Sequence, residues 1–193
     1  MLEKSHLRRE LRRQRAAIAP AQRLAAAWAI TYYPQILQKL RKGRKVAFYI
    51  AVAGEFPTWP LIFLALRRGC EVYLPVTPKR GRRLSFVRLN EQSQWHRGKF
   101  NIPVPSHTQQ CPVRDLDSVF VPLLGFVDSG LRLGQGGGYY DFTFAFRRLR
   151  QIYLRPNLIG VAFACQQLVE LPREPWDLLL DAVVTEQGWL QTK

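Results

Sequence analysis

Residues 119–141 read VFVPLLGFVDSGLRLGQGGGYYD, and this stretch carries most of the information about the fold. It begins with Val119–Leu124, a short apolar run typical of a strand that is buried on both faces of a parallel sheet. A loop with five glycines between Gly130 and Gly138 follows, and the pattern after it predicts a helix over residues 139–153. A strand that leads through a glycine-rich loop into a helix is characteristic of open α/β sheets.

The segment on the N-terminal side of this stretch has the same organisation. The apolar run VAFYIA, residues 46–51, predicts a second buried strand. Thr58 is placed to cap a helix over residues 59–68, which ends at Gly69, and residues 71–76 predict the next strand. Strand, helix and strand in this order predict a parallel crossover unit.

The rest of the chain adds elements of both kinds to the same domain. The other expected elements are helices over residues 3–18 and 21–40, strands over 84–89 and 158–163, an irregular loop over 98–105, and a hairpin that pairs 182–185 with 189–190. We therefore predict one domain over residues 1–193. Its fold class is α/β, a three-layer α/β/α arrangement in which helices cover both faces of an open, mostly parallel sheet.

The composition excludes several classes of protein. The chain has 193 residues, of which 47% are hydrophobic and 12% aromatic, so it can bury a core and is not disordered. No apolar stretch reaches the roughly 20 residues that a membrane-spanning helix needs. Three cysteines without metal-ligand spacing are typical of reduced thiols. We expect a cytoplasmic monomer that does not bind a membrane.

The charge is strongly basic. Lys and Arg number 29 and Asp and Glu 14, which gives a net charge of +15. Such a charge attracts anions of every kind, nucleotides and nucleic acids included. The basic residues gather at 1–16 and 79–99, but the sequence does not show the pattern of a nucleic-acid-binding face, in which such residues alternate with exposed aromatic residues. A nucleic acid is therefore not the expected partner.

The glycine-rich loop is the best candidate for a ligand site. In open parallel sheets ligands bind beyond the carboxyl ends of the strands, and glycine lets backbone N–H groups approach them closely. Arg132 can bind a phosphate, and Asp141 can hold Mg²⁺ or its waters. The loop lacks the GK[ST] of a P-loop, and Tyr139 stands where the dinucleotide fingerprint has a small residue. A plain glycine-rich turn remains the alternative.

The segment LGFVDSGLRLGQGGGYYD closely resembles the signature of the 5-formyltetrahydrofolate cyclo-ligases, also called 5,10-methenyltetrahydrofolate synthetases. Four further landmarks of the family occur in its order along the chain: Lys4-x-x-x-Arg8, Glu55-x-x-Thr58, Phe100-Asn101-Ile102-Pro103 and Asp181. The resemblance therefore spans nearly the whole chain.

The resemblance implies a ligase that forms a C–N bond. The family cyclises 5-formyltetrahydrofolate, with or without a polyglutamate tail, to 5,10-methenyltetrahydrofolate and releases ADP and phosphate. ATP is the co-substrate and Mg²⁺ the cofactor. The γ-phosphoryl group is transferred to the formyl oxygen, and N10 then attacks the activated carbon. Such a reaction requires alignment and charge neutralisation rather than a protein nucleophile.

The resemblance also assigns residues to the ATP and Mg²⁺ sites. Lys4 and Arg8 of the helix over 3–18, which are neighbours on one side of that helix, match residues that contact ATP phosphates. Asp141 and Asp181 match acids near Mg²⁺, and Arg132 and Asp141 are the implied catalytic residues. The ATP-binding loop corresponds to Arg132, Leu133, Gly134, Gln135, Gly136, Gly137, Gly138, Tyr139 and Tyr140.

A second set of positions matches the folate site. Glu55 corresponds to a residue that binds the pterin, and a carboxylate suits its paired N–H donors. Ile50 matches an apolar wall and Phe100 an aromatic position beside the folate, and the loop residues Gln135, Gly136, Gly137, Gly138 and Tyr139 also face the substrate. The chain departs from the family pattern at Pro57, Val127 and Phe142.

Each of these residues also has a plain structural interpretation. The alternatives are a solvated basic face for Lys4 and Arg8, an ion pair with an arginine for Glu55, core packing for Ile50, a loop anchor for Phe100 and a strand-edge acid for Asp181. For the whole chain, two other functions stay open: an arginine-rich nucleic-acid-binding protein on an α/β scaffold, and an enzyme of similar fold that handles sugar phosphates or CoA.

Overall fold

The sheet that the apolar runs predict is present in the computed structural model, which describes residues 4–52, 54–90, 92–106, 109–149 and 155–192. Within these residues the main sheet has eight strands in the order β12-β11-β10-β7-β1-β2-β3-β6. The five strands from β11 to β2 are parallel, and β12 and β3 pair antiparallel with their neighbours. The strands are β1 (Lys45–Ala47), β2 (Glu71–Val76), β3 (Ser85–Leu89), β6 (Gln110–Cys111), β7 (Ser118–Pro122), β10 (Asn157–Val161), β11 (Ala182–Thr185) and β12 (Gly188–Gln191).

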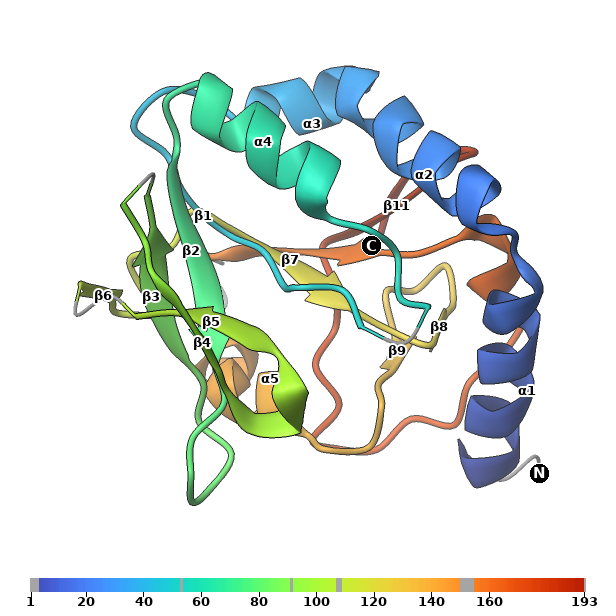
Figure 1. Cartoon of the computed structure of the whole chain (residues 1–193). Helices are drawn as coiled ribbons and strands as arrows, with labels where there is room; N and C mark the ends of the chain where they lie inside the picture. Colours follow the sequence, from blue (N-terminus) through green and yellow to red (C-terminus); the bar gives the residue numbers. More distant parts are fainter. Residues whose placement is uncertain (1–3, 53, 91, 107–108, 150–154, 193) are drawn as a thin grey trace.

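Helices cover both faces of this sheet, which confirms the predicted α/β/α arrangement (Figure 1). One face carries α2 (Pro20–Ala29), η1 (Ile30–Tyr32), α3 (Pro34–Lys39) and α4 (Trp59–Arg67), and the other carries α5 (Tyr139–Thr143) and η3 (Ala145–Leu149). Helix α1 (Lys4–Ala17) stands at one end of the sheet, and η4 (Ala164–Gln166) follows β10. No helix in the described ranges has the length and apolar character needed to cross a bilayer.

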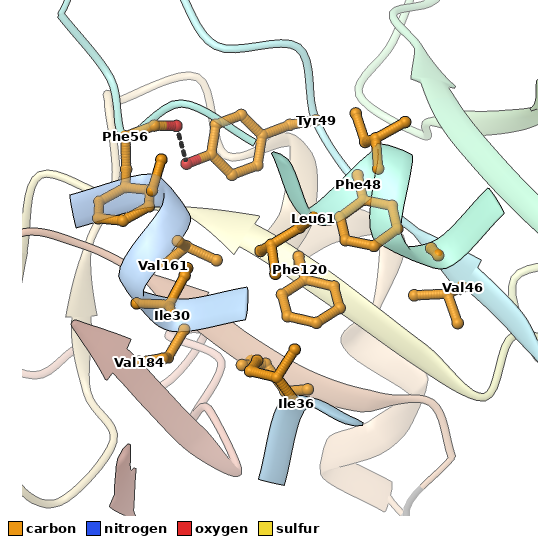
Figure 2. Close-up of a cluster of buried hydrophobic side chains, with 14 of the residues drawn as sticks. Ile30, Ile36, Val46, Phe48, Tyr49, Phe56, Leu61, Phe120, Val161 and Val184 are labelled. Carbon is orange, nitrogen blue, oxygen red and sulfur yellow. Dashed lines mark hydrogen bonds between the residues drawn. The ribbon is translucent and has the colours of Figure 1, made fainter. Parts of the chain in front are cut away.

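The core between the sheet and α2–α4 is aromatic at its centre. Phe48, directly after β1, and Phe120 of β7 stack with ring centroids 4.6 Å apart and are both fully buried (Figure 2). Ile30 of η1 and Leu61 of α4 close over them from the helical layer. This packing fixes the two strands from whose ends the candidate site is built.

The strand predicted over residues 46–51 is shorter than expected, since β1 ends at Ala47. Beyond it, the carbonyl of Tyr49 accepts a hydrogen bond from the Thr58 hydroxyl at 2.5 Å, and the Tyr49 hydroxyl donates to the carbonyl of Phe56 at 2.9 Å. The N–H of Phe48 still donates to the carbonyl of Tyr73 in β2 at 3.0 Å, and from Tyr49 on the chain bonds to its own loop. Thr58 occupies the predicted N-cap position of α4, but its side chain accepts no cap hydrogen bond, because its backbone is already helical (φ −98°, ψ −9°) and not extended as in a capping residue.

Two predicted helices are interrupted. The helix over 21–40 divides into α2, η1 and α3, because Pro34 lacks an N–H group and the residue before it, Tyr33, is extended. The helix over 139–153 is α-helical only to Thr143, whose hydroxyl bonds back to the carbonyl of Tyr139 at 2.6 Å. It continues as η3 to Leu149, and residues 150–153 lie outside the described residues.

Two short ribbons occur where loops were predicted. The loop expected at 98–105 contains η2 (Lys99–Asn101) and β5 (Pro103–Pro105), and β5 pairs with β4 (Trp95–Arg97), which lies just before the loop. Within the glycine-rich segment, β8 (Gly125–Phe126) pairs with β9 (Arg132–Leu133). The turn between β8 and β9 accommodates the unusual Val127, whose N–H donates to the carbonyl of Leu131 at 3.1 Å.

Candidate active site

Most of the predicted site residues gather beyond the carboxyl ends of β1 and β7, whereas Asp181 directly precedes β11 and lies at the opposite edge, where the parallel strands begin. The chain leaves β1 towards β2 on one side, while β7 lies on the other side, so the strand order reverses between them. Such a switch point is where open α/β sheets bind ligands. The loop after β1 carries Glu55, and the chain after β7 leads through β8 and β9 into the glycine-rich loop, residues 134–138.

The glycine-rich loop presents unpaired donors. Gly136 has φ +104° and Gly138 φ +65°, which are left-handed conformations that glycine adopts at little cost. No backbone N–H of residues 134–138 has a hydrogen-bond acceptor within the described part of the chain. Successive N–H groups left in this way form a concave surface suited to an anion.

Helix α1 brings basic side chains to this loop. Leu11 of α1 packs with Leu124 and Leu133 in a small buried cluster, which fixes the helix against β9. From there the Nε of Arg8 donates to the carbonyl of Gly134 at 3.0 Å, and a terminal nitrogen of Arg12 donates to Oε1 of Gln135 at 3.2 Å. The sequence patterns did not predict that Arg12 contacts the glycine-rich loop.

Lys4, one turn before Arg8, reaches a different segment. Its Nζ lies 3.1 Å from a carboxylate oxygen of Asp177 and 3.8 Å from one of Glu174. Lys4 and Arg8 therefore do not form a merely solvated basic face. Both are half-buried, and together they connect α1 to the loop and to the segment around Asp177.

Arg132 and Asp141 form a closed arrangement with the backbone of Leu178. The buried guanidinium of Arg132 donates to Oδ1 of Asp141 at 3.0 Å and to the carbonyl of Leu178 at 2.8 Å. The N–H of Leu178 donates back to Oδ1 of Asp141 at 3.1 Å. This fixes the start of α5 beside Asp177, an acid that sequence reasoning missed because Asp181 was the acid matched to the family.

The two acids expected near Mg²⁺, Asp141 and Asp181, differ in how their carboxylate oxygens are hydrogen-bonded. Asp181 accepts from Arg147 at 2.8 Å through Oδ1 and from the N–H of Leu158 at 2.7 Å through Oδ2. Asp141 uses only Oδ1, and its Oδ2 has no partner among the described residues. No group of three or more His, Cys, Asp or Glu in that part of the chain could hold a metal ion. Mg²⁺ in nucleotide sites is held by one or two carboxylates together with phosphates and waters, and the Oδ2 of Asp141 suits such a role, whereas both oxygens of Asp181 accept hydrogen bonds from the protein.

Glu55 is a buried carboxylate in contact with the glycine-rich loop. It is 8% exposed; its Oε2 accepts from the N–H of Val52 and its Oε1 from the side-chain amide of Gln135, both at 3.2 Å. Burial raises the pKa of Glu55, while these hydrogen bonds and the charge of Arg15 oppose the rise. The Gln135 bond joins the two loops that were predicted to bind the two substrates.

Three further groups, of which Arg15 and Tyr49 are buried and Tyr140 is partly buried, interact electrostatically with Glu55. Arg15 of α1 is 3% exposed, and burial lowers its pKa although the charge of Glu55 opposes this. Burial raises the pKa of Tyr49 and of Tyr140, and the charge of Glu55 adds to both shifts. Arg15 and Tyr49 were not among the predicted site residues, because only the folded chain brings α1 close to the end of β1.

Phe100 lies at the tip of the β4–β5 hairpin, next to the glycine-rich loop. Its ring is 64% exposed and meets Tyr139 edge-on, with centroids 6.3 Å apart, and Nζ of Lys99 donates to the Tyr139 hydroxyl at 3.2 Å. Phe100 and Asn101 both have φ near +60°, a conformation uncommon outside glycine and one that clusters at functional sites. Ile50, in contrast, is buried in the main core cluster.

Two surface cavities lie away from these loops. One, of about 510 Å³, is lined by residues of η3, of the segment 173–181 and of the C-terminal strand. The other, of about 550 Å³, lies between the β8–β9 turn and residues 167–169. The space between the glycine-rich loop and Glu55 is bridged by the Gln135 side chain.

Comparison with known proteins agrees with this arrangement. The profile of the 5-formyltetrahydrofolate cyclo-ligase family matches residues 1–186. The chain is 35% identical to the Escherichia coli K12 5-formyltetrahydrofolate cyclo-ligase over 183 residues, 91% of this chain and 96% of that protein. It is 33% identical to the Haemophilus influenzae 5-formyltetrahydrofolate cyclo-ligase over 188 residues, 94% and 97% of the two chains.

A solved structure extends the similarity to the fold. The Aquifex aeolicus 5,10-methenyltetrahydrofolate synthetase superposes with a TM-score of 0.80 at 28% identity, and the match covers 100% of this chain and 94% of that one. The family profile spans α1, the loop after β1, the glycine-rich loop and Asp177. The chain therefore belongs to the 5-formyltetrahydrofolate cyclo-ligase family of enzymes.

Proposed function

We propose that this enzyme uses ATP and Mg²⁺ to cyclise 5-formyltetrahydrofolate to 5,10-methenyltetrahydrofolate, with release of ADP and phosphate. One observation carries the proposal. Unpaired backbone donors in residues 134–138 and the buried carboxylate of Glu55 lie one hydrogen bond apart, joined by Gln135, at the switch point of the sheet. The donors suit the phosphates of a nucleotide, and the carboxylate suits a ligand with paired N–H groups.

On the nucleotide side, the loop N–H groups and the side chains of Arg8 and Lys4 bind the phosphates of ATP. Arg8 already lies against Gly134, so it sits beside the loop donors. Arg132 acts mainly as a positioning residue, because its guanidinium donates to Asp141 and to the carbonyl of Leu178 and so holds the start of α5. Asp141 would hold Mg²⁺ through Oδ2, and the bound ion would neutralise charge on the phosphates.

On the folate side, Glu55 accepts hydrogen bonds from the pterin. The amide of Gln135 donates to the same carboxylate in this structure, so it occupies an acceptor position that the pterin would use. Gln135 must therefore move when folate binds. Phe100 and Tyr139 supply aromatic surface at the hairpin tip for the rest of the substrate.

The reaction then needs only alignment by the chain. The γ-phosphorus forms a bond to the formyl oxygen as its bond to ADP breaks. N10 attacks the formyl carbon, the C–O bond to phosphate breaks, and the N10 proton passes to water. No side chain becomes covalently attached; the residues orient the two substrates and neutralise the charge that develops.

The direct test is to mix the protein with Mg-ATP and 5-formyltetrahydrofolate and to follow the absorbance of methenyltetrahydrofolate. We expect product only when both substrates and Mg²⁺ are present, with one ADP formed per methenyltetrahydrofolate. Product without ATP, or ADP formation that does not depend on the folate, would refute the proposal. We further infer a monomer that acts in the cytoplasm, in keeping with cysteines that form no disulfide among the described residues.

A further inference from the structure

The segment that positions Arg132 and Asp141 also lines a cavity. Leu178 bonds to both of those residues through its backbone, and it is one of the residues around the cavity of about 510 Å³ between η3 and the C-terminal strand. No residue of the range 132–140 lines this cavity. It is therefore separate from the glycine-rich loop, although the two share one segment of chain.

The charged side chains around this cavity leave an excess of positive charge. Its two acids already have cationic partners, since Asp177 pairs with Lys4 at 3.1 Å and Asp181 with Arg147 at 2.8 Å. Arg148 and Arg173 also line the cavity, are exposed, and have no hydrogen bond or ion pair within the described residues. Guanidinium groups placed in this way match phosphate and carboxylate oxygens.

A buried donor at the same place lacks an acceptor. Arg147 is 6% exposed, and its Nε is the one buried side-chain nitrogen or oxygen in the described part of the chain without a hydrogen-bond partner. Leaving a buried charged donor unpaired is costly, and such groups in folded proteins call for a physical explanation. Arg147 is also one of the residues that line the cavity, so its guanidinium adds positive charge at the same place.

We propose that this cavity is a binding site for a small anion that carries phosphate or carboxylate groups, held by Arg147, Arg148 and Arg173. The volume is in the range of sites for small metabolites rather than macromolecules. The apolar wall formed by Leu178 and Leu180 accommodates the uncharged part of such a ligand. This site is additional to the two substrate sites and does not depend on the reaction proposed above.

The test is a titration of the protein with inorganic phosphate, followed by the ³¹P line width. Four proteins are compared: wild type, R148Q/R173Q, K79Q/R80Q and R8Q. The K79Q/R80Q variant loses the same charge from an exposed turn outside the cavity, and R8Q removes a contact of the glycine-rich loop. Arg148 and Arg173 are exposed, so the double variant should fold, which circular dichroism checks.

We expect the Kd for phosphate to rise at least about tenfold in R148Q/R173Q and to stay within about twofold of wild type in K79Q/R80Q, whereas R8Q should weaken binding less than R148Q/R173Q does, because it affects only phosphate bound at the glycine-rich loop. If phosphate binding were weakened equally in K79Q/R80Q, it would depend only on the net charge of the protein, and the proposal would be overturned. No broadening with wild type, or loss confined to R8Q, would overturn it as well. Competition with citrate then distinguishes the ligand class, because only a site that accepts carboxylates releases phosphate to citrate.

Discussion

The loops that follow β1 and β7 begin at the same edge of the sheet but are held in opposite ways. The loop after β1 is tied down by buried bonds between Thr58 and the Tyr49 carbonyl and between the Tyr49 hydroxyl and the Phe56 carbonyl. The glycine-rich loop, residues 134–138, keeps its backbone N–H groups without acceptors in the described chain. The first loop fixes one buried carboxylate, and the second presents several donors. The difference matches the needs of a ligand with N–H groups and of a ligand with phosphates.

The Glu55 carboxylate is the feature that most clearly distinguishes the loop after β1 from the glycine-rich loop. Replacing Glu55 by Gln keeps the shape but removes the charge that would accept two hydrogen bonds from the pterin. We expect kcat/KM for 5-formyltetrahydrofolate to fall about a hundredfold, since hydrogen bonds to charged groups contribute roughly 1.5–3 kcal/mol each. The KM for ATP should stay within about twofold. Steady-state kinetics with E170Q, an exposed acid elsewhere, provides the control; equal losses in both variants would contradict this role.

The backbone of the second loop can be tested with two glycines. Gly136 has φ +104°, whereas Gly134 has no positive φ and an added Cβ there meets nothing within 4 Å. We expect Gly136→Ala to raise the KM for ATP about tenfold, because strain of roughly 1–3 kcal/mol shifts the loop donors. Gly134→Ala is the matched control and should leave the KM unchanged. If both variants behave like wild type, the loop geometry does not serve the nucleotide.

A substitution in the loop after β1 should lower the stability of the protein and leave ATP binding unchanged. Thr58→Val removes the hydroxyl that donates to the buried Tyr49 carbonyl. The free energy of unfolding should fall by about 1–3 kcal/mol, the cost of an unsatisfied buried acceptor, while the KM for ATP stays as in wild type. Urea denaturation measures the first quantity. A stability equal to that of wild type would mean that this bond does not hold the loop.

The buried carboxylate also predicts a pH dependence of stability. Because burial raises the pKa of Glu55 above its ordinary value of 4.5, the folded chain binds this proton more tightly than the unfolded chain. The contribution of Glu55 to stability is therefore lost as pH rises from 4.5 through the raised pKa. Urea denaturation across this range should show a steeper decline for wild type than for E55Q. Parallel profiles would contradict the raised pKa.

Local patterns were sufficient for the strands and for the class of fold. Buried apolar runs such as Val119–Leu124 predict parallel strands, and the structure has β7 at residues 118–122. Local patterns gave a wrong prediction where the same residues are compatible with two different structures. Pro103 and Pro105 suggested an irregular loop, but β5 has only β4 as a partner and tolerates prolines that a central strand would not.

The site was predictable as a set of segments but not as a set of contacts. Glu55 and Gln135 were both expected near the substrate, yet the bond that joins them spans 80 residues and depends on the whole sheet. The same holds for Arg8 with Gly134, which are 126 residues apart. The pairing of Asp181 with Arg147, which occupies Oδ1 of this acid, has no local signature. Sequence patterns predict which residues carry the chemistry, and tertiary packing decides which of their atoms remain available.

The central claim is that the backbone N–H groups of residues 134–138 bind the phosphates of the nucleotide. The most direct measurement is a ¹⁵N–¹H correlation spectrum of the labelled protein during a titration with Mg-ADP. We predict large shifts of the amide signals of Gly134, Gln135, Gly136, Gly137 and Gly138, with small changes in the loop after β1. Saturation of the protein with Mg-ADP while these five signals stay in place would contradict the account.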